Sequence, residues 1–358
     1  MDNLTHGLTG ALMGQMGLKK KTGLGLAALV LGANLPDIDV VGLLWLDGTE
    51  ALGFRRGITH GPIGVVLLPI GLAALLWGFD RWQDGRGKRP AGRDPVSFKW
   101  LYILGLIGAI SHSLMDWLNV YGVRFLYPFD KSWYYGDTLF IIDVWLWAIL
   151  ALGVWWSARA EKRGGAWKQT ATATMCIAVA YTGASWALTQ VAKQNALTLV
   201  EYTFQLEPME VVASPVPFLP INREILFRYS ASEELGGGVV FGAGDYTPSE
   251  GTLLFTPHDR YTGRERLSLD TPQDPSRWEQ LSRYSGFDEE AAYAVGTKSS
   301  QVEAFFVWSR MPEIYAVPDD EGNLSFKVFD QRFKDPRAVS RFSIWFDKNG
   351  DLMELPAP

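Results

Sequence analysis

Residues 98–120, FKWLYILGLIGAISHSLMDWLNV, combine an apolar run with polar side chains near one end. A helix of about 20 apolar residues crosses the hydrocarbon core of a bilayer. His112 and Asp116 are four positions apart, and Asn119 follows three residues later, so the three share one helix face. Ionisable groups at membrane depth are costly and usually mark a functional site. The stretch therefore predicts a membrane-spanning helix that carries part of a site.

Further apolar segments surround this one, in a chain of 358 residues that is 47% hydrophobic. Four are long enough to span: residues 23–46, 58–79, 138–157 and 170–191. A shorter glycine-rich stretch, 4–18, either spans or forms a re-entrant helix. The pattern predicts a polytopic α-helical membrane domain over residues 1–192, with about five to six spans.

The connecting loops alternate in charge. Three are basic: Lys19-Lys20-Lys21, the stretch from Arg81 to Lys99, and residues 158–168. The positive-inside rule places basic loops in the cytoplasm. Alternation then puts the N-terminus and everything beyond residue 191 outside. We therefore expect a multi-pass membrane protein with an extracytoplasmic C-terminal domain.

Histidine and aspartate side chains from different segments fall at the same outer level of this topology. Histidine and carboxylate ligands together are typical of hydrolytic metal centres. Two other interpretations remain, hydrogen bonding between helices and a proton or ion pathway. A pathway would also place polar groups in the inner halves, but residues 65–76 and 148–156 are almost wholly apolar. The residues at the outer level are His6, Asp37, Asp39, His60, His112, Asp116 and Asp143.

The C-terminal part, residues 193–358, reads as a β-rich domain. Apolar and polar residues alternate with period two between Gly, Pro and Asp breaks, which favours antiparallel strands. Asn349-Gly350 is typical of a hairpin turn. The domain is acidic and has no basic stripe, so a nucleic-acid partner is not expected. The expected strands are 201–206, 224–229, 304–308, 324–329 and 341–346.

An ordered set of motifs resembles the YdjM-like family of inner-membrane proteins. The motifs are His6-Gly7, Pro36-Asp37-Ile38-Asp39, Arg56-Gly57-Ile58-Thr59-His60, His112-Ser113-Leu114-Met115-Asp116, Tyr121-Gly122, Tyr127-Pro128-Phe129 and Leu139-Phe140-Ile141-Ile142-Asp143. The resemblance implies a metal-dependent hydrolase, under LexA control in some members. Many members have His where this chain has Arg55, and Pro where it has Val144. The first departure removes one candidate ligand, so the resemblance implies that position 55 is not essential for metal.

Together these observations predict a hydrolase with its site at the outer membrane–water interface. The expected metal ligands are His6, Asp37, His60, His112 and Asp116, holding Zn²⁺ or else Mn²⁺ or Mg²⁺. Asp39 or Asp143 is expected to act as general base, and Arg56 to hold a phosphate or another anionic leaving group. Access from the bilayer suggests membrane lipids as partners and a lipid or lipid-linked substrate. The alternative is a non-enzymatic transporter or sensor with a structural metal site.

Overall fold

The computed structural model divides into two compact units, which are described separately. Unit 1 comprises residues 1–41, 54–187 and 217–220, and unit 2 comprises residues 42–53, 188–216 and 221–358. The structure describes residues 1–46, 48–204, 208–230, 239–255, 283–284, 292–296, 298–318, 324–333 and 342–353.

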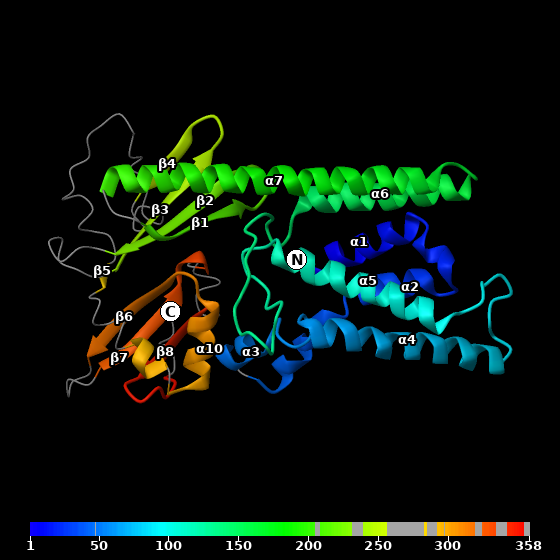
Figure 1. Ribbon diagram of the computed structural model, residues 1–358, viewed down its shortest axis with the longest axis horizontal. Helices are drawn as coiled ribbons and strands as arrows, with labels where there is room; N and C mark the ends of the chain where they lie inside the picture. Colours follow the sequence, from blue (N-terminus) through cyan, green and yellow to red (C-terminus); the bar gives the residue numbers. More distant parts are fainter. Residues whose placement is uncertain are drawn as a thin grey trace. The chain divides into compact units, whose positions relative to one another are not determined.

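The N-terminal part is helical, as expected (Figure 1). Helix α5 packs against both α2 and α4, and α1 packs against α2 and α6. The elements are α1 (Asn3–Gln15), η1 (Leu18–Lys21), α2 (Gly25–Gly32), η2 (Pro36–Leu44), α3 (Gly48–Phe54), α4 (Pro62–Gly85), α5 (Phe98–Trp117), α6 (Val144–Lys162) and α7 (Trp167–Phe204).

Among the described residues, three helices are long and apolar enough to cross a membrane: α4, α5 and α7. A fourth span results if α2 and η2, which are bent by 55° where they meet, count as one. Helix α6 carries four tryptophans and a charged last turn, which lower its mean hydropathy. Helix α1 has 13 residues and is too short to cross at a rise of about 1.5 Å per residue. The finer count of five to six spans therefore stays a prediction.

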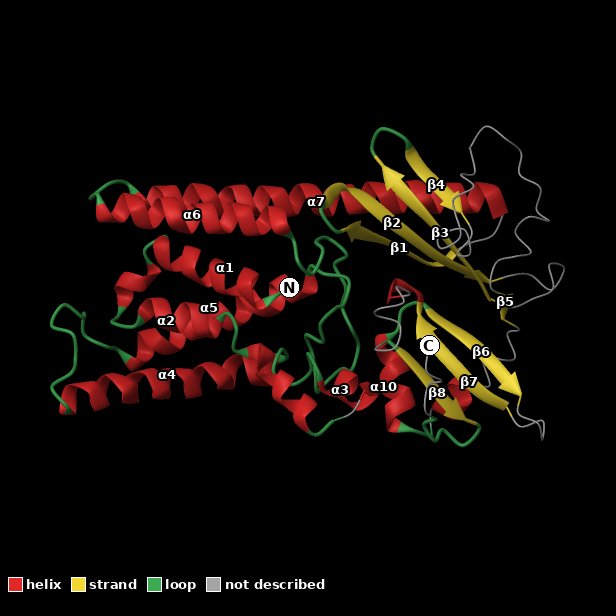
Figure 2. Cartoon of the chain, turned by 180° about the vertical axis from the view of Figure 1, so that it is seen from behind, coloured by secondary structure: helices red, strands yellow, loops and turns green. Residues whose placement is uncertain are grey.

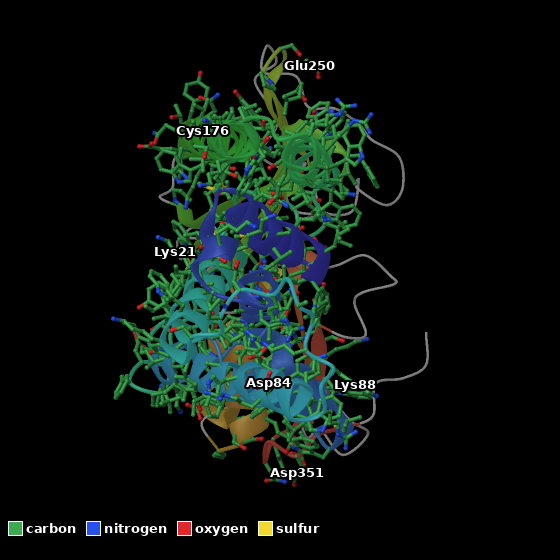
Figure 3. All side chains as sticks on the ribbon, turned by 90° about the vertical axis from the view of Figure 1, so that its right-hand side faces the viewer. Lys21, Asp84, Lys88, Cys176, Glu250 and Asp351 are labelled. Atoms are coloured by element: carbon green, nitrogen blue, oxygen red, sulfur yellow. The ribbon has the colours of Figure 1, made fainter. Side chains whose placement is uncertain are left out.

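The three basic loops lie together at one end of unit 1. Lys19 forms an ion pair with Glu161 and lies over the Trp167 ring. The Gly23 amide donates to Pro95 O at 3.1 Å. Figure 3 looks onto this end, where Lys21, Asp84 and Lys88 are labelled. The loop of residues 118–143 lies at the opposite end of the same helices (Figure 1). The grouping of basic loops is the one that the charge pattern predicts.

Close contact between α2 and α5 depends on glycine. A Cβ added to Gly32 would lie 2.6 Å from Gly105 O, and one added to Gly108 would lie 2.6 Å from Ala33 N. Because no side chain separates them, the two backbones approach closely. This contact fixes the end of α2 beside the turn of α5 that carries His112.

The described residues of unit 2 contain two antiparallel sheets, helix α10, most of α3 and the C-terminal turns of α7 (Figure 2). The first sheet has the order β1-β2-β3-β4, with β5 paired to β3, and the second has the order β6-β7-β8. Their elements are β1 (Pro208–Val216), β2 (Leu219–Ser230), β3 (Val239–Thr247), β4 (Gly251–Phe255), β5 (Arg283–Tyr284), α10 (Ser300–Trp308), β6 (Pro312–Pro318), β7 (Leu324–Asp330), η5 (Gln331–Phe333) and β8 (Ser343–Asp347).

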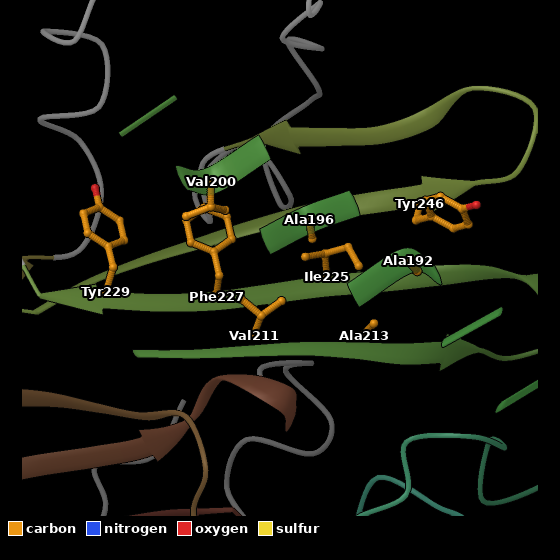
Figure 4. Close-up of a cluster of buried hydrophobic side chains, with 9 residues drawn as sticks. All are labelled: Ala192, Ala196, Val200, Val211, Ala213, Ile225, Phe227, Tyr229 and Tyr246. Carbon is orange, nitrogen blue, oxygen red and sulfur yellow. The ribbon is translucent and has the colours of Figure 1, made fainter. Parts of the chain in front are cut away.

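The core of the first sheet is formed with the C-terminal turns of α7 (Figure 4). Small side chains of the helix, Ala192 and Ala196, face large ones from β2, Ile225 and Phe227. Alternate residues of a strand point to one face, so β2 presents this apolar row to the helix.

The expected β-rich C-terminal part is confirmed, but two of its expected strands are wrong. Residues 201–204 form the last turn of α7, and 205–206 lie outside the described residues. Residues 304–308 belong to α10, where Val302, Phe305 and Trp308 are buried. These three residues are three positions apart, which is helical spacing. The short apolar run at 304–308 was read as a strand because it does not by itself show this spacing. The expected strands at 224–229, 324–329 and 341–346 overlap β2, β7 and β8.

Candidate metal centre

Four of the expected ligands meet at one point in unit 1. Asp37 comes from the first turn of η2, His60 from the loop before α4, and His112 and Asp116 from α5. One ligand atom from each lies within 4.8 Å of the others. His60, His112 and Asp116 are buried, and Asp37 is 12% exposed. Pro36 begins η2, where the chain bends by 55° after α2. The Asp37 carboxylate, in the first turn of η2, lies 3.7 Å from His112 of α5.

The distances between the four donor atoms match those around a tetrahedral metal ion. The Nε2 atoms of His60 and His112 are 3.1 Å apart. They lie 3.4 and 3.7 Å from Asp116 Oδ2 and 4.0 and 3.7 Å from Asp37 Oδ1. Ligand bonds of about 2.0–2.2 Å in a tetrahedral site place neighbouring donors about 3.3 Å apart. The four residues therefore fit a divalent ion with little rearrangement.

Both histidines are oriented through their other ring nitrogen. His112 Nδ1 lies 2.8 Å from Ala33 O, which can only accept a hydrogen bond. Nδ1 must then carry the proton, and Nε2 keeps a lone pair for a ligand. His60 Nδ1 lies 2.9 Å from Thr59 Oγ1 and 3.6 Å from Asp39 Oδ2. Such outer contacts are typical of metal-ligating histidines.

His6 lies beside the group of four. Its Nε2 is 3.2 Å from Asp116 Oδ1, and its ring stacks on His112 with centroids 3.8 Å apart. The Met1 amine also contacts Asp116 Oδ1. The expected role of His6 as a direct ligand stays a prediction, because the contact that the structure describes is with a ligand residue.

Arg56 is used inside the protein. Its Nε lies 2.8 Å from Asp116 Oδ2, and its Nη1 donates to Gly122 O at 2.7 Å. The guanidinium also lies over the Tyr121 ring. Its side chain is 5% exposed and neutralises Asp116. The expected role of Arg56 in holding a phosphate stays a prediction.

The two expected general bases have different surroundings. Asp39 Oδ2 accepts from the Arg56 amide at 2.7 Å and lies behind His60, so Asp39 orients the ligand loop. Asp143 caps α6 by accepting from Leu146 N at 2.8 Å and from the Tyr181 hydroxyl at 2.8 Å. A carboxylate occupied in this way favours a structural role.

Sequence reasoning missed Arg55. Its Nη2 lies 3.3 Å from Asp37 Oδ1, and its Nε lies 3.3 Å from Asp39 Oδ1. The signal was the Arg55-Arg56 pair, but nothing in it told which arginine would face the site. Arg56 has a φ of 51°, in the left-handed region, and this turn sends the two neighbouring side chains to different partners.

The helices and the buried His/Asp cluster define a membrane protein with a possible metal-binding site. Residues 1–192 match the family described as YdjM inner membrane protein. That match covers more than half of the chain, which therefore belongs to this family, as the motifs predict.

A curated relative also resembles part of the chain. Uncharacterized protein YfhP of Bacillus subtilis (strain 168) is 25% identical over 132 residues, which is 36% of each chain. The match thus spans about a third of that relative's length. No solved structure matches the chain significantly.

Proposed function

We propose that this protein is a membrane-bound, metal-dependent hydrolase whose site lies at the outer membrane–water interface. The observation that carries the proposal is the buried group of Asp37, His60, His112 and Asp116. These side chains would hold the ion. Two imidazoles suit Zn²⁺, while the carboxylates also accept Mn²⁺ or Mg²⁺. A divalent ion in such a site supplies Lewis-acid polarisation of the scissile group and activates water for attack.

The chain's own residues prepare this site. The Ala33 carbonyl fixes the ring orientation of His112. The Thr59 hydroxyl, which also contacts Asp39, fixes that of His60. Arg56 offsets the buried charge of Asp116. Residues fixed in advance by their outer contacts need little reorganisation during a reaction.

A lipid or lipid-linked substrate is supported by position and by a cavity. A cavity of about 430 Å³ lies among α1, α5, α6 and α7 of unit 1. Its lining is almost wholly apolar and includes Met115, which precedes Asp116, and Thr9, which lies one turn beyond His6. The volume lies within the range of about 300–1,000 Å³ that is usual for ligand sites. An apolar chain in this cavity would place its polar end near the cluster.

The test uses purified wild type, His112→Ala, Asp116→Asn and a chelated sample on a panel of phosphate-ester and acyl-ester lipids. We expect hydrolysis by wild type alone, with activity restored to the chelated sample by Zn²⁺, Mn²⁺ or Mg²⁺. Thermal stability is measured in parallel, because a structural ion contributes to folding and its removal lowers stability sharply. Sharp destabilisation with no hydrolysis in any sample would instead support the transporter or sensor with a structural metal.

A further inference from the structure

Arg55 and Arg56 are adjacent in sequence but differ in burial and in their hydrogen-bond partners. The Arg55 side chain is 27% exposed, and that of Arg56 is 5% exposed. Arg55 Nε and Asp39 Oδ1 face each other at 3.3 Å, yet neither makes a hydrogen bond among the described contacts. Arg55 is therefore the cation at the open side of the cluster, and it has donor capacity left.

The charge balance of the cluster favours an anionic ligand once a metal is bound. Asp37, Asp39 and Asp116 supply three negative charges, and Arg55 and Arg56 supply two positive ones. A divalent ion turns this excess of one negative charge into an excess of one positive charge. A neutral ester would leave this charge unbalanced, whereas a phosphate group would offset it.

Arginine is suited to that partner. Its planar guanidinium binds phosphate through two parallel hydrogen bonds. The ion would recruit Asp37 as a ligand and so weaken that carboxylate's hold on Arg55, whose Nη2 contact is long at 3.3 Å. The Arg55 side chain already reaches solvent, so its Nη atoms could turn toward a ligand while its Nε stays beside the buried Asp39 carboxylate.

We propose that Arg55 binds a phosphate group of the substrate at the open side of the metal centre. The proposal rests on the proposed function and makes the substrate a phosphate ester. Arg55 acts as a binding residue that sets specificity, and Arg56 remains the partner of Asp116.

The test measures binding by calorimetry rather than turnover. Zn²⁺-loaded wild type, Arg55→Gln, Arg55→Lys and Arg86→Gln are titrated with inorganic phosphate and with short-chain phosphatidic acid in detergent. Arg86 is an exposed arginine over Trp82, in the loop at the far end of unit 1, and serves as the matched control. Metal content is determined for each sample.

We expect Arg55→Gln to weaken binding of both ligands about 10- to 100-fold, the loss typical of a charge-assisted hydrogen bond. Arg55→Lys should lose less, and Arg86→Gln should bind as wild type does. Tighter binding of phosphatidic acid than of phosphate would identify a lipid phosphate ester as the ligand, and equal binding would show that the phosphate group alone is recognised.

Unchanged phosphate affinity in Arg55→Gln or Arg55→Lys, with full metal content, would overturn this proposal and leave the proposed hydrolase standing. So would a metal-loaded wild type that binds neither ligand. A wild type that takes up no metal would overturn both proposals. If Arg55→Gln fails to fold, Arg55→Lys decides the matter, because a purely structural ion-pair role predicts no loss of phosphate affinity in the lysine variant.

Discussion

The Nε2 atoms of His60 and His112 lie 3.1 Å apart, although the two residues are 52 positions apart in sequence. His60 comes from a loop, and His112 comes from the C-terminal part of helix α5. Two such nitrogens brought together in a buried site, beside two carboxylates, make an arrangement that a shared cation stabilises.

Replacing either of these histidines should release the metal. We expect His60→Gln and His112→Gln to lose more affinity than the roughly 10- to 100-fold that removal of an outer contact costs. His6→Gln removes a neighbour of Asp116 and should stay within that range. Competition with a chromogenic chelator measures the three affinities. Equal losses in all three variants would show that His6 is a direct ligand.

Arg56 should contribute strongly to stability. Arg56→Ala removes the guanidinium that lies against the buried Asp116 carboxylate, and breaking a buried ion pair costs about 3–5 kcal/mol of unfolding free energy. The double variant Arg56→Ala/Asp116→Asn should lose less than the sum of the two single losses, because the removed groups are partners. Denaturant unfolding of metal-free protein gives all four values. Additive losses would show that the 2.8 Å contact contributes little.

The loop of residues 118–143 should face outward and the basic loops inward. In a Cys176→Ser background, which removes the one native cysteine, single cysteines replace Ser132 and Lys88. A membrane-impermeant maleimide on intact spheroplasts should label position 132 directly, and position 88 only after lysis. The reverse pattern would move the site to the cytoplasmic face.

Asp330 of unit 2 should make stability depend on pH. Burial by itself would raise the pKa of Asp330, but Arg332 and the hydrogen bond from Ser309 hold the pKa below its ordinary value of 3.8. A lowered pKa in the folded state stabilises the protein above the unfolded value and ceases to do so as pH falls through the folded value. Thermal unfolding from pH 7 to pH 3 should therefore show a loss below about pH 4 that is smaller in Asp330→Asn. Identical pH profiles would contradict this assignment.

The sequence predicted the features of the site that follow from local spacing. His112 and Asp116 share a helix face because they are four residues apart. The sequence also predicted a helical part followed by a β-rich part, because apolar runs and period-two alternation differ visibly. Helical and strand patterns are hard to separate in short apolar runs, which explains the error at 304–308.

The sequence could not predict that Arg55 would contact Asp37 and Arg56 would contact Asp116. This arrangement depends on the left-handed backbone of Arg56, which an arginine adopts only where tertiary contacts hold it there. The hydrogen bond from the Arg56 backbone amide to Asp39 and the one from its side chain to Gly122 O are such contacts. They join residues far apart in the chain, so no local pattern contains them.

The hydrogen bond between His112 Nδ1 and Ala33 O has a consequence for how this site can evolve. The acceptor is a main-chain atom, so every amino acid at position 33 would supply it. Substitutions at position 33 would therefore leave the proton of His112 on Nδ1. What can still change is the spacing of α2 and α5, which is governed by Gly32, Gly105 and Gly108. Adaptation to a different metal should accordingly leave its traces at these glycines, one helix turn or more away from the ion.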